Sequence, residues 1–391
     1  MIEILPSFLL FLGLIAGQVF KLPLGQASGL TLLDLVVVFL DILALVQLRF
    51  KLKSPPLWII TALIFSLIAI ISLIFSPLKL TFPETVFSFA YTLRFLAFIL
   101  LGWVIFSGAF PTLKTSSVLI SSGVVLAILG LLQLIFLPNL SFLTTQGWDP
   151  HYLRTVSTLL DPNFLGAFLV LTLLLIQGNS YLKSKMKKIA FLITYLALIT
   201  TFSRSSAIML GVSFFTLAIL QRSWRTGLLA VILTVGFIFS LIFYNQTIAQ
   251  SRNINRQQSA EYRVSSWKQG RQLFESHPFL GVGFNSYRYA LQQYHLASDS
   301  FIQSRGGSGN DSSLLFIAST TGILGLLSYG LFLLSLIYLA FKNYQNKNNW
   351  GLILLSALPG LLAHSLFVNS LFYPWILVWV TVAVAQLDSR L

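Results

Sequence analysis

Apolar residues occur along this chain in long runs rather than in the short alternating stretches of a soluble protein. A helix that spans a membrane needs about 20 mostly apolar residues, and windows of that length predict about twelve spans. They lie near residues 4–20, 28–48, 57–76, 88–107, 116–137, 163–178, 188–203, 205–221, 226–245, 312–341, 349–368 and 371–387. We therefore expect an all-α, polytopic integral membrane protein that forms a single domain over residues 1–391.

The basic residues between these runs predict the orientation of the chain. Short cytoplasmic loops collect Lys and Arg, and thirteen of the 25 basic residues fall in alternate loops on the side shared with both termini. The short loops of the other side hold only Lys21, Lys79, Arg154 and Arg204. We therefore expect a protein of the cytoplasmic membrane with both termini in the cytoplasm. Two longer segments, about 138–162 and about 246–311, would then lie on the outer face.

The composition supports a membrane protein and excludes several kinds of site. Only 9% of the residues are charged, against roughly 25% in an average soluble protein. The chain has no Cys, which excludes thiolate nucleophiles, Cys-ligated zinc and disulfide bonds, and its four His are scattered. We expect neither a metal ion nor a cofactor. The net charge of +14 is divided between the loops of a membrane protein, so we expect contact with membrane lipid and not with nucleic acid.

The polar segment 246–311 has the pattern of an outer subdomain of amphipathic helices. Residues 260–274 carry apolar side chains at helical spacing, and the pair His277-Pro278 ends this helix because the residue before proline avoids the α conformation. The run Gly281-Val282-Gly283 permits a tight turn or a close approach of two backbones. A second amphipathic helix is predicted around residues 287–294. Such a subdomain suits an enzyme or receptor for a large polar substrate.

Several short motifs in this half of the chain follow the order typical of one family. They are Asp161-Pro162-Asn163-Phe164-Leu165-Gly166, Thr201-Phe202-Ser203-Arg204-Ser205, Arg263-Val264-Ser265-Ser266-Trp267 with His277-Pro278-Phe279-Leu280-Gly281-Val282-Gly283-Phe284, and Asp311-Ser312-Ser313-Leu314-Leu315 with Thr321-Gly322-Ile323-Leu324-Gly325. With these motifs, the number of spans and the place of the long loop, the chain resembles the O-antigen ligase and O-antigen polymerase family.

The resemblance implies a membrane glycosyltransferase with a GT-C-like fold, active in lipopolysaccharide or polysaccharide biosynthesis. Such an enzyme moves a glycan from a polyprenyl-pyrophosphate-linked saccharide donor to a hydroxyl of a glycan or glycolipid acceptor. The transfer would be inverting and independent of metal ions, with arginines on the pyrophosphate. The choice between ligase and polymerase stays open here. A flippase or transporter of lipid-linked oligosaccharides is the alternative function, although we find no inverted repeat of the kind that many transporters carry.

Two arginines are the main candidates for the pyrophosphate site. This leaving group gains negative charge as the glycosidic bond breaks, and a guanidinium is always charged and pairs with phosphate oxygens through two hydrogen bonds. Arg204 lies in a short outward turn, where basic residues are disfavoured, and Arg263 lies on the first loop helix. The simpler roles are contact with the outer lipid headgroups for Arg204 and a solvated helix face for Arg263. The further substrate-binding candidates are Arg154, Arg271, Arg288, Trp267 and Asn310.

Asp311 is the candidate for the group that accepts a proton from the acceptor hydroxyl. The family usually has His followed by Asn at the positions of Asp311 and Ser312, and a carboxylate can take a proton as an imidazole does. We predict a catalytic role for Asp311 beside the two arginines, compatible with its other role as the N-cap of the tenth span. Asp161 and Asn163 are interpreted as the start of a helix, and His277 as the end of one.

A few charged residues lie inside the predicted spans. Asp34 and Asp41 share one face of the second span, and Arg94 lies in the middle of the fourth. Charges inside a membrane are costly and are usually paired or functional. We predict an Asp–Arg pair that holds these two helices together, the alternative being a proton or ion relay. His364, in the eleventh span, is interpreted as a core histidine with satisfied ring nitrogens.

Overall fold

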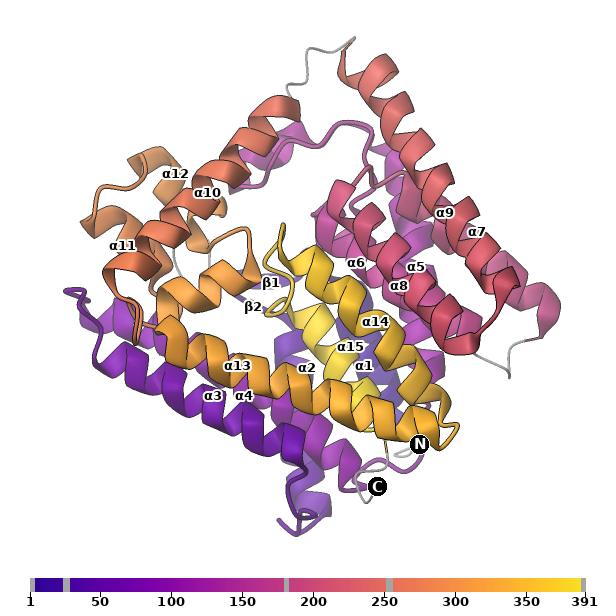
Figure 1. The fold of residues 1–391 in the computed structure, drawn as a ribbon, viewed down its shortest axis with the longest axis horizontal. Helices are drawn as coiled ribbons and strands as arrows, with labels where there is room; N and C mark the ends of the chain where they lie inside the picture. Colours follow the sequence, from indigo (N-terminus) through magenta and orange to yellow (C-terminus); the bar gives the residue numbers. More distant parts are fainter. Residues whose placement is uncertain (1–3, 24–28, 179–182, 251–255, 388–391) are drawn as a thin grey trace.

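The computed structural model describes residues 4–23, 29–178, 183–250 and 256–387 and is almost entirely helical (Figure 1). A helix lies at each of the twelve predicted spans. These helices are α1 (Leu5–Ala16), α2 (Leu32–Gln47), α3 (Leu57–Ile74), α4 (Phe82–Phe106), α5 (Thr115–Phe136), α6 (Pro162–Gly178), α7 (Ser184–Ile199), α8 (Arg204–Gln221), α9 (Trp224–Phe243), α13 (Ser313–Gln345), α14 (Asn349–Ser365) and α15 (Pro374–Val384). Between α1 and α2, strands β1 (Lys21–Pro23) and β2 (Gly29–Thr31) form a short antiparallel hairpin.

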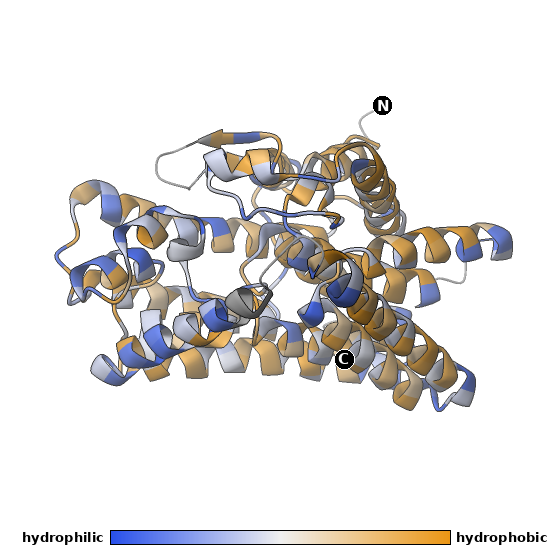
Figure 2. Cartoon of the chain, turned by 90° about the horizontal axis from the view of Figure 1, so that it is seen from above, coloured by the Kyte–Doolittle hydropathy of each residue, from blue (hydrophilic) through white to orange (hydrophobic). Residues whose placement is uncertain are grey.

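Within the described residues, six helices are long and apolar enough to cross a membrane, namely α3, α4, α5, α8, α9 and α13. Helices α1, α6 and α15 are apolar but shorter. Figure 2 shows the long helices hydrophobic along most of their length, with hydrophilic residues mainly at their ends and in the shorter helices. The chain is therefore a multi-pass helical membrane protein. Twelve crossings and the cytoplasmic location of the termini stay predictions, and residues 1–3 and 388–391 lie outside the described part.

The predicted boundaries of the helices are close to the observed ones, with one clear error at α4. This helix begins at Phe82 rather than near residue 88. The backbone N–H of Thr81 donates to the Glu84 carboxylate at 2.7 Å, and a proline occupies the first turn. An acidic side chain and a proline both favour a helix start, so these polar residues extend the helix beyond its apolar run.

The segment between α9 and α13 folds into short helices, as its pattern predicted. After the π-helical turn η3 (Tyr244–Ala249) come α10 (Arg256–Ser276), α11 (Tyr287–Gln293), α12 (Asp299–Gln303) and the short turn η4 (Gly306–Ser308). Helix α10 ends at Ser276, directly before the predicted stop at His277-Pro278. Helices α10, α11 and α12 gather at one end of the helix bundle (Figure 1), and α10 packs on α13.

A break in α13 receives the Gly281–Gly283 run. Gly322 has φ 64° inside α13, a conformation that glycine adopts without strain. The carbonyls of Ser319 and Thr320 accept the backbone N–H groups of Val282 and Gly283, each at 3.0 Å. A Cβ atom at Gly322 would overlap the backbone of Phe279. Of the two predicted uses of the Gly281–Gly283 run, the close approach of two backbones is observed, and its partner is Ser319–Thr320, directly before the Thr321–Gly325 motif.

An aromatic cluster anchors the same loop to the transmembrane helices. The Phe65 ring of α3 lies 5.5 Å from Phe95 of α4, 4.9 Å from Tyr329 of α13 and 5.6 Å from Phe284, measured between ring centroids. Phe372 contacts all four of these rings. Phe284 is fully buried, so the outer helices are fixed to the bundle by a hydrophobic contact as well as by backbone hydrogen bonds.

Candidate functional site

The starts of α6 and α8 are joined by hydrogen bonds between two of the sequence motifs. The Ser203 hydroxyl donates to the Asn163 side-chain oxygen at 2.8 Å, and the Ser206 hydroxyl donates to the Asn163 carbonyl at 3.3 Å. The Arg154 Nε donates to the carbonyl of Thr201 at 2.9 Å. Arg204, the first residue of α8, is thus held on a turn whose geometry is fixed on both sides.

The segment before α13 is joined to α10 in a similar way. The Asn310 amide donates to the Ser266 carbonyl and, at 3.0 Å, to the Tyr287 hydroxyl. The backbone N–H of Asp311 donates to the Ser266 hydroxyl at 3.0 Å. Gly270 allows this contact, because a Cβ atom there would lie 2.5 Å from the Asn310 amide nitrogen. Asn310, predicted to bind substrate, uses its amide to position Asp311 relative to α10.

These two junctions bring the predicted site residues into one charged cluster around Arg263 of α10. Arg263 interacts electrostatically with Arg204 and with Asp311. It also interacts with Asp149, from the segment between α5 and α6. Arg154 interacts with the same Asp149. We call Arg154, Arg204, Arg263, Asp149 and Asp311 the central cluster; its members come from the two segments predicted to face outward and from the start of α8.

The two predicted clamp arginines form no ion pair within the described part of the chain. Within the described residues, neither Arg204 nor Arg263 makes a hydrogen bond or an ion pair. Arg204 is exposed and Arg263 is half-buried. Two guanidinium groups close enough to repel each other gain most from an anion that binds both, because phosphate oxygens accept charge-assisted hydrogen bonds from arginine. The arrangement is therefore suited to an anionic ligand.

Asp311 is not the N-cap of α13. The cap is Ser312, whose hydroxyl accepts the backbone N–H of Leu315 at 3.4 Å. The Asp311 carboxylate accepts no hydrogen bond from the described residues. Burial raises the pKa of Asp311 to about 6, against the opposing effect of Arg263 and with smaller contributions from Asp149 and Asp161. A half-buried carboxylate without a hydrogen-bond partner, with a pKa near neutrality, can accept a proton at physiological pH.

The remaining sequence-predicted candidates are placed differently. Arg271 is exposed and pairs with Glu275 at 2.7 Å, one turn further along α10. Arg288 is buried in α11 and donates to the Ser304 carbonyl at 2.8 Å. Trp267 packs against Phe367, and its indole N–H is buried without an acceptor among the described residues.

Two residues near the cluster were interpreted as structural in the sequence, and the structure modifies both interpretations. Asp161 does start α6, since its carboxylate accepts the backbone N–H groups of Asn163 and Phe164, but it also interacts electrostatically with Asp149 and Asp311. His364 was expected to be hydrogen bonded. It is fully buried and interacts electrostatically with Arg263, and among the described residues neither ring nitrogen has a hydrogen-bond partner of good geometry.

The predicted charge pair inside the bundle is confirmed. Arg94 of α4 contacts the Asp34 carboxylate of α2 at 2.8 Å and also donates to the Gly29 carbonyl at 2.9 Å. Asp41 is buried about two turns further along α2. One of its carboxylate oxygens has no hydrogen-bond partner among the described residues. The pair Asp34–Arg94 therefore joins α2, α4 and the β-hairpin.

Asp149 was missed altogether. The low number of acidic residues could have pointed to it. The chain has only 11 of them, and two, Asp149 and Asp161, lie in the shorter segment predicted to face outward.

No group of three or more His, Cys, Asp or Glu side chains suited to a metal ion occurs in the described ranges.

The comparison with protein families now bears on this geometry. Residues 189–330 match the family model described as O-antigen ligase. The resemblance to the O-antigen ligase family is confirmed. The matched segment runs from α7 to the middle of α13 and includes Arg204, Arg263 and Asp311. It indicates a membrane enzyme of a glycan-transferring, ligase-like type, whose partners are a lipid-linked glycan and an acceptor. No curated protein sequence matches the chain.

Proposed function

We propose that this O-antigen ligase-like protein transfers a glycan from a polyprenyl-pyrophosphate carrier to an acceptor hydroxyl on the outer face of the cytoplasmic membrane. One observation carries the proposal. Within the described residues, Arg204 and Arg263 form no ion pair; they interact electrostatically with each other, and Arg263 also interacts with Asp311, a carboxylate that accepts no hydrogen bond there. This is a site for an anionic leaving group with a proton acceptor beside it.

The chemistry follows from the charges. The pyrophosphate would bind to Arg204 and Arg263, which neutralise the negative charge that grows on it as the glycosidic bond breaks. The acceptor hydroxyl would give its proton to Asp311 while its oxygen attacks the anomeric carbon from the face opposite the pyrophosphate. A single displacement of this kind inverts the anomeric configuration. Arg263 has two roles, because it also favours the charged form of Asp311.

In this proposal Arg204 and Arg263 offset two negative charges of the pyrophosphate, the role that a divalent ion would otherwise fill. Arg154 donates one N–H to Thr201 and lies near Asp149, so it supports the turn that carries Arg204. We therefore propose a metal-independent transfer. Fixed guanidinium groups would neutralise the pyrophosphate, as a divalent metal ion does in metal-dependent enzymes.

The test uses the purified protein in lipid nanodiscs with a polyprenyl-pyrophosphate oligosaccharide and EDTA. Release of polyprenyl pyrophosphate and the size of the glycan products are followed together. A ladder of longer chains identifies a polymerase, and release only after addition of a separate glycolipid acceptor identifies a ligase. Movement of intact donor across a vesicle bilayer, without any release, would replace the proposal with a flippase.

A further inference from the structure

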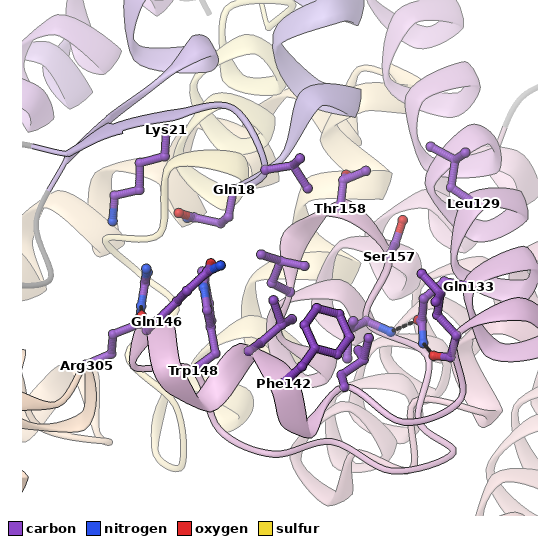
Figure 3. Close-up of a pocket in the computed structure, with 16 residues that line it drawn as sticks. Gln18, Lys21, Leu129, Gln133, Phe142, Gln146, Trp148, Ser157, Thr158 and Arg305 are labelled. Carbon is purple, nitrogen blue, oxygen red and sulfur yellow. Dashed lines mark hydrogen bonds between the residues drawn. The ribbon is translucent and has the colours of Figure 1, made fainter.

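A second polar site lies beside the central cluster, in a cavity of about 770 Å³ between α1, α5 and the segment that joins α5 to α6 (Figure 3). Pockets that bind small molecules have similar volumes. Lys21 and Arg305 line one end of the cavity with Gln18, Gln146 and Trp148, whereas Leu129 and Phe142 lie toward the other end. The cavity is thus cationic at one end, whereas the other end is uncharged and combines apolar side chains with Gln133 and Ser157.

At the cationic end, packing against Trp148 orients the N–H donors of the Arg305 guanidinium. The Arg305 guanidinium lies over the Trp148 ring at 3.7 Å from its centroid, and its Nε donates weakly to the Gln146 carbonyl at 3.5 Å. Stacking on an aromatic face leaves the N–H groups at the edge of the guanidinium plane available to another acceptor. Burial, then Arg305 and Arg94, lower the pKa of Lys21 to about 8, partly offset by Asp34. A bound anion would relieve this accumulation of positive charge.

Among the described residues, two polar atoms of the cavity wall are buried and have no hydrogen-bond partner of good geometry. Ser157 is 5% exposed, lines the cavity, and its hydroxyl has no hydrogen-bond partner among the described residues. At the cationic end, the side-chain oxygen of Gln18 is also buried, and its only neighbour of this kind among the described residues is the Tyr373 side chain, without good hydrogen-bond geometry. Buried polar groups are normally satisfied by protein, water or ligand. The Ser157 hydroxyl can donate to a phosphate oxygen or bind a sugar hydroxyl, whereas the Gln18 oxygen can only accept a hydrogen bond from a hydroxyl group.

The wall itself is rigid. Gly17 has φ 63°, and its close approach to Thr158 leaves no space for a Cβ atom. The Gln18 backbone N–H donates to the Thr158 carbonyl at 2.8 Å, and the Gln133 side-chain oxygen accepts the Val156 N–H at 3.0 Å. A site whose walls are fixed by hydrogen bonds loses little entropy when a ligand binds.

Exposed apolar side chains among the lining residues indicate an occupant that comes from the membrane. Val19, Leu137 and Phe142 all line the cavity and are 56%, 53% and 55% exposed. In a membrane protein such side chains contact lipid, so an amphiphile can enter from the bilayer with its alkyl chain against them. A free sugar or a soluble anion would gain nothing from this apolar border.

The cavity is linked to the central cluster by chain connectivity and by charge. Arg305 precedes Asp311 by six residues, a stretch that spans at most about 20 Å. Trp148, under Arg305, is followed directly by Asp149 of the central cluster. Tyr373 interacts electrostatically with both Arg305 and Asp161. A headgroup held at Arg305 therefore lies within reach of Asp311 for a short glycan.

We propose that this cavity binds the phosphate headgroup of a lipid-anchored acceptor, with the phosphate on Lys21 and Arg305 and the attached glycan directed toward Asp311. The inference rests on the proposed function, since it assigns the second substrate of that transfer. It makes the acceptor a phosphorylated amphiphile rather than a neutral glycolipid or a protein hydroxyl. The donor and the acceptor then have separate cationic sites.

The binding test needs no turnover. A fluorescent dodecyl monophosphate is titrated into the protein in nanodiscs of zwitterionic lipid, with the matching dodecyl alcohol and inorganic phosphate as comparison ligands. An Arg204→Gln/Arg263→Gln background removes the donor site. In this background we expect saturable binding of the monophosphate, weaker by about 10-fold or more after Lys21→Gln and Arg305→Gln. Lys79→Gln, which removes an exposed cation of another loop, is the matched control and should leave binding unchanged.

Each outcome decides the proposal. The proposal would be overturned if dodecyl alcohol or inorganic phosphate bound as tightly as the dodecyl monophosphate. It would also be overturned if neither Lys21→Gln nor Arg305→Gln weakened binding of the monophosphate. Arg305→Lys keeps the charge and should retain part of the affinity, which separates loss of the cation from loss of fold. In turnover, Arg305→Gln should raise the KM of the acceptor and leave that of the donor unchanged. The reverse pattern would assign the cavity to the donor, and absence of all turnover with intact monophosphate binding would refute the transfer reaction but not the phosphate site.

Discussion

Replacing Arg263 by Gln removes the cation at the centre of the cluster and keeps a polar side chain of similar reach. Arg263 interacts with Arg204 on one side and with Asp311 on the other, so we expect two separate effects. Removal of one preorganised donor to a developing negative charge costs about 10²–10³ in kcat, or roughly 3–4 kcal/mol. We expect a loss of this size in the rate of polyprenyl pyrophosphate release.

The second effect is on the pH dependence. If Asp311 acts as the base, as proposed, the rate falls as the pH falls through the pKa of its carboxyl, about 6 in the wild type. Arg263 lowers this pKa, so its removal raises the pKa and shifts the acid limb of the profile to higher pH. Rates are measured across this pH range for Arg263→Gln and for Lys268→Gln, which removes an exposed cation of the same helix. Identical rates and identical acid limbs for the two variants would refute the reasoning.

Three further changes test other parts of the structure. Asp311→Asn should lower kcat by about 10²–10⁴ without weakening donor binding, whereas Asp311→His should keep part of the activity. Donor affinity and initial rates are measured for both variants, and an Asn variant with wild-type activity would exclude Asp311 as the proton acceptor. Gly322→Ala forces a Cβ atom into the Phe279 backbone and should strongly lower the melting temperature. Gly330→Ala, on the same helix, is the control: its Cβ atom meets nothing within 4 Å, so the change should be neutral or stabilise the protein by about 0.5–1 kcal/mol. Arg94→Gln leaves the Asp34 carboxylate buried and unpaired and should cost about 3–5 kcal/mol of unfolding free energy, with much of this recovered by adding Asp34→Asn; additive losses would mean that the pair is not coupled.

The helices were predictable because a transmembrane helix is encoded locally. A run of apolar residues specifies a span whatever lies next to it, so all twelve runs coincide with helices. Local signals also placed the end of α10 at His277-Pro278 and the close approach at Gly281–Gly283. The start of α4 was misjudged because hydropathy ignores capping residues such as Glu84.

The candidate site was only partly predictable, because it is built from contacts between distant segments. Arg204 was selected because it lies on the side where basic residues are disfavoured, and Arg263 because of its motif and its place on the loop helix; in the structure the two interact electrostatically. Asp149 has no local pattern, and only folding brings it near Arg263. The same argument that selected Arg204 applies equally to Lys21, another basic residue on that side, which was passed over. Whether His364 finds a partner depends on packing that no sequence pattern reports.

The most direct test of the central claim compares donor consumption by the wild type and by Arg204→Gln in the same nanodiscs, with EDTA and a phosphorylated glycolipid acceptor present. The account predicts that the wild type releases polyprenyl pyrophosphate and forms a longer glycan with inverted anomeric configuration. It also predicts that correctly folded Arg204→Gln releases polyprenyl pyrophosphate at a rate lower by a factor of about 10² or more. Equal release by both proteins, or a product with retained configuration, would contradict a transfer carried out by Arg204, Arg263 and Asp311.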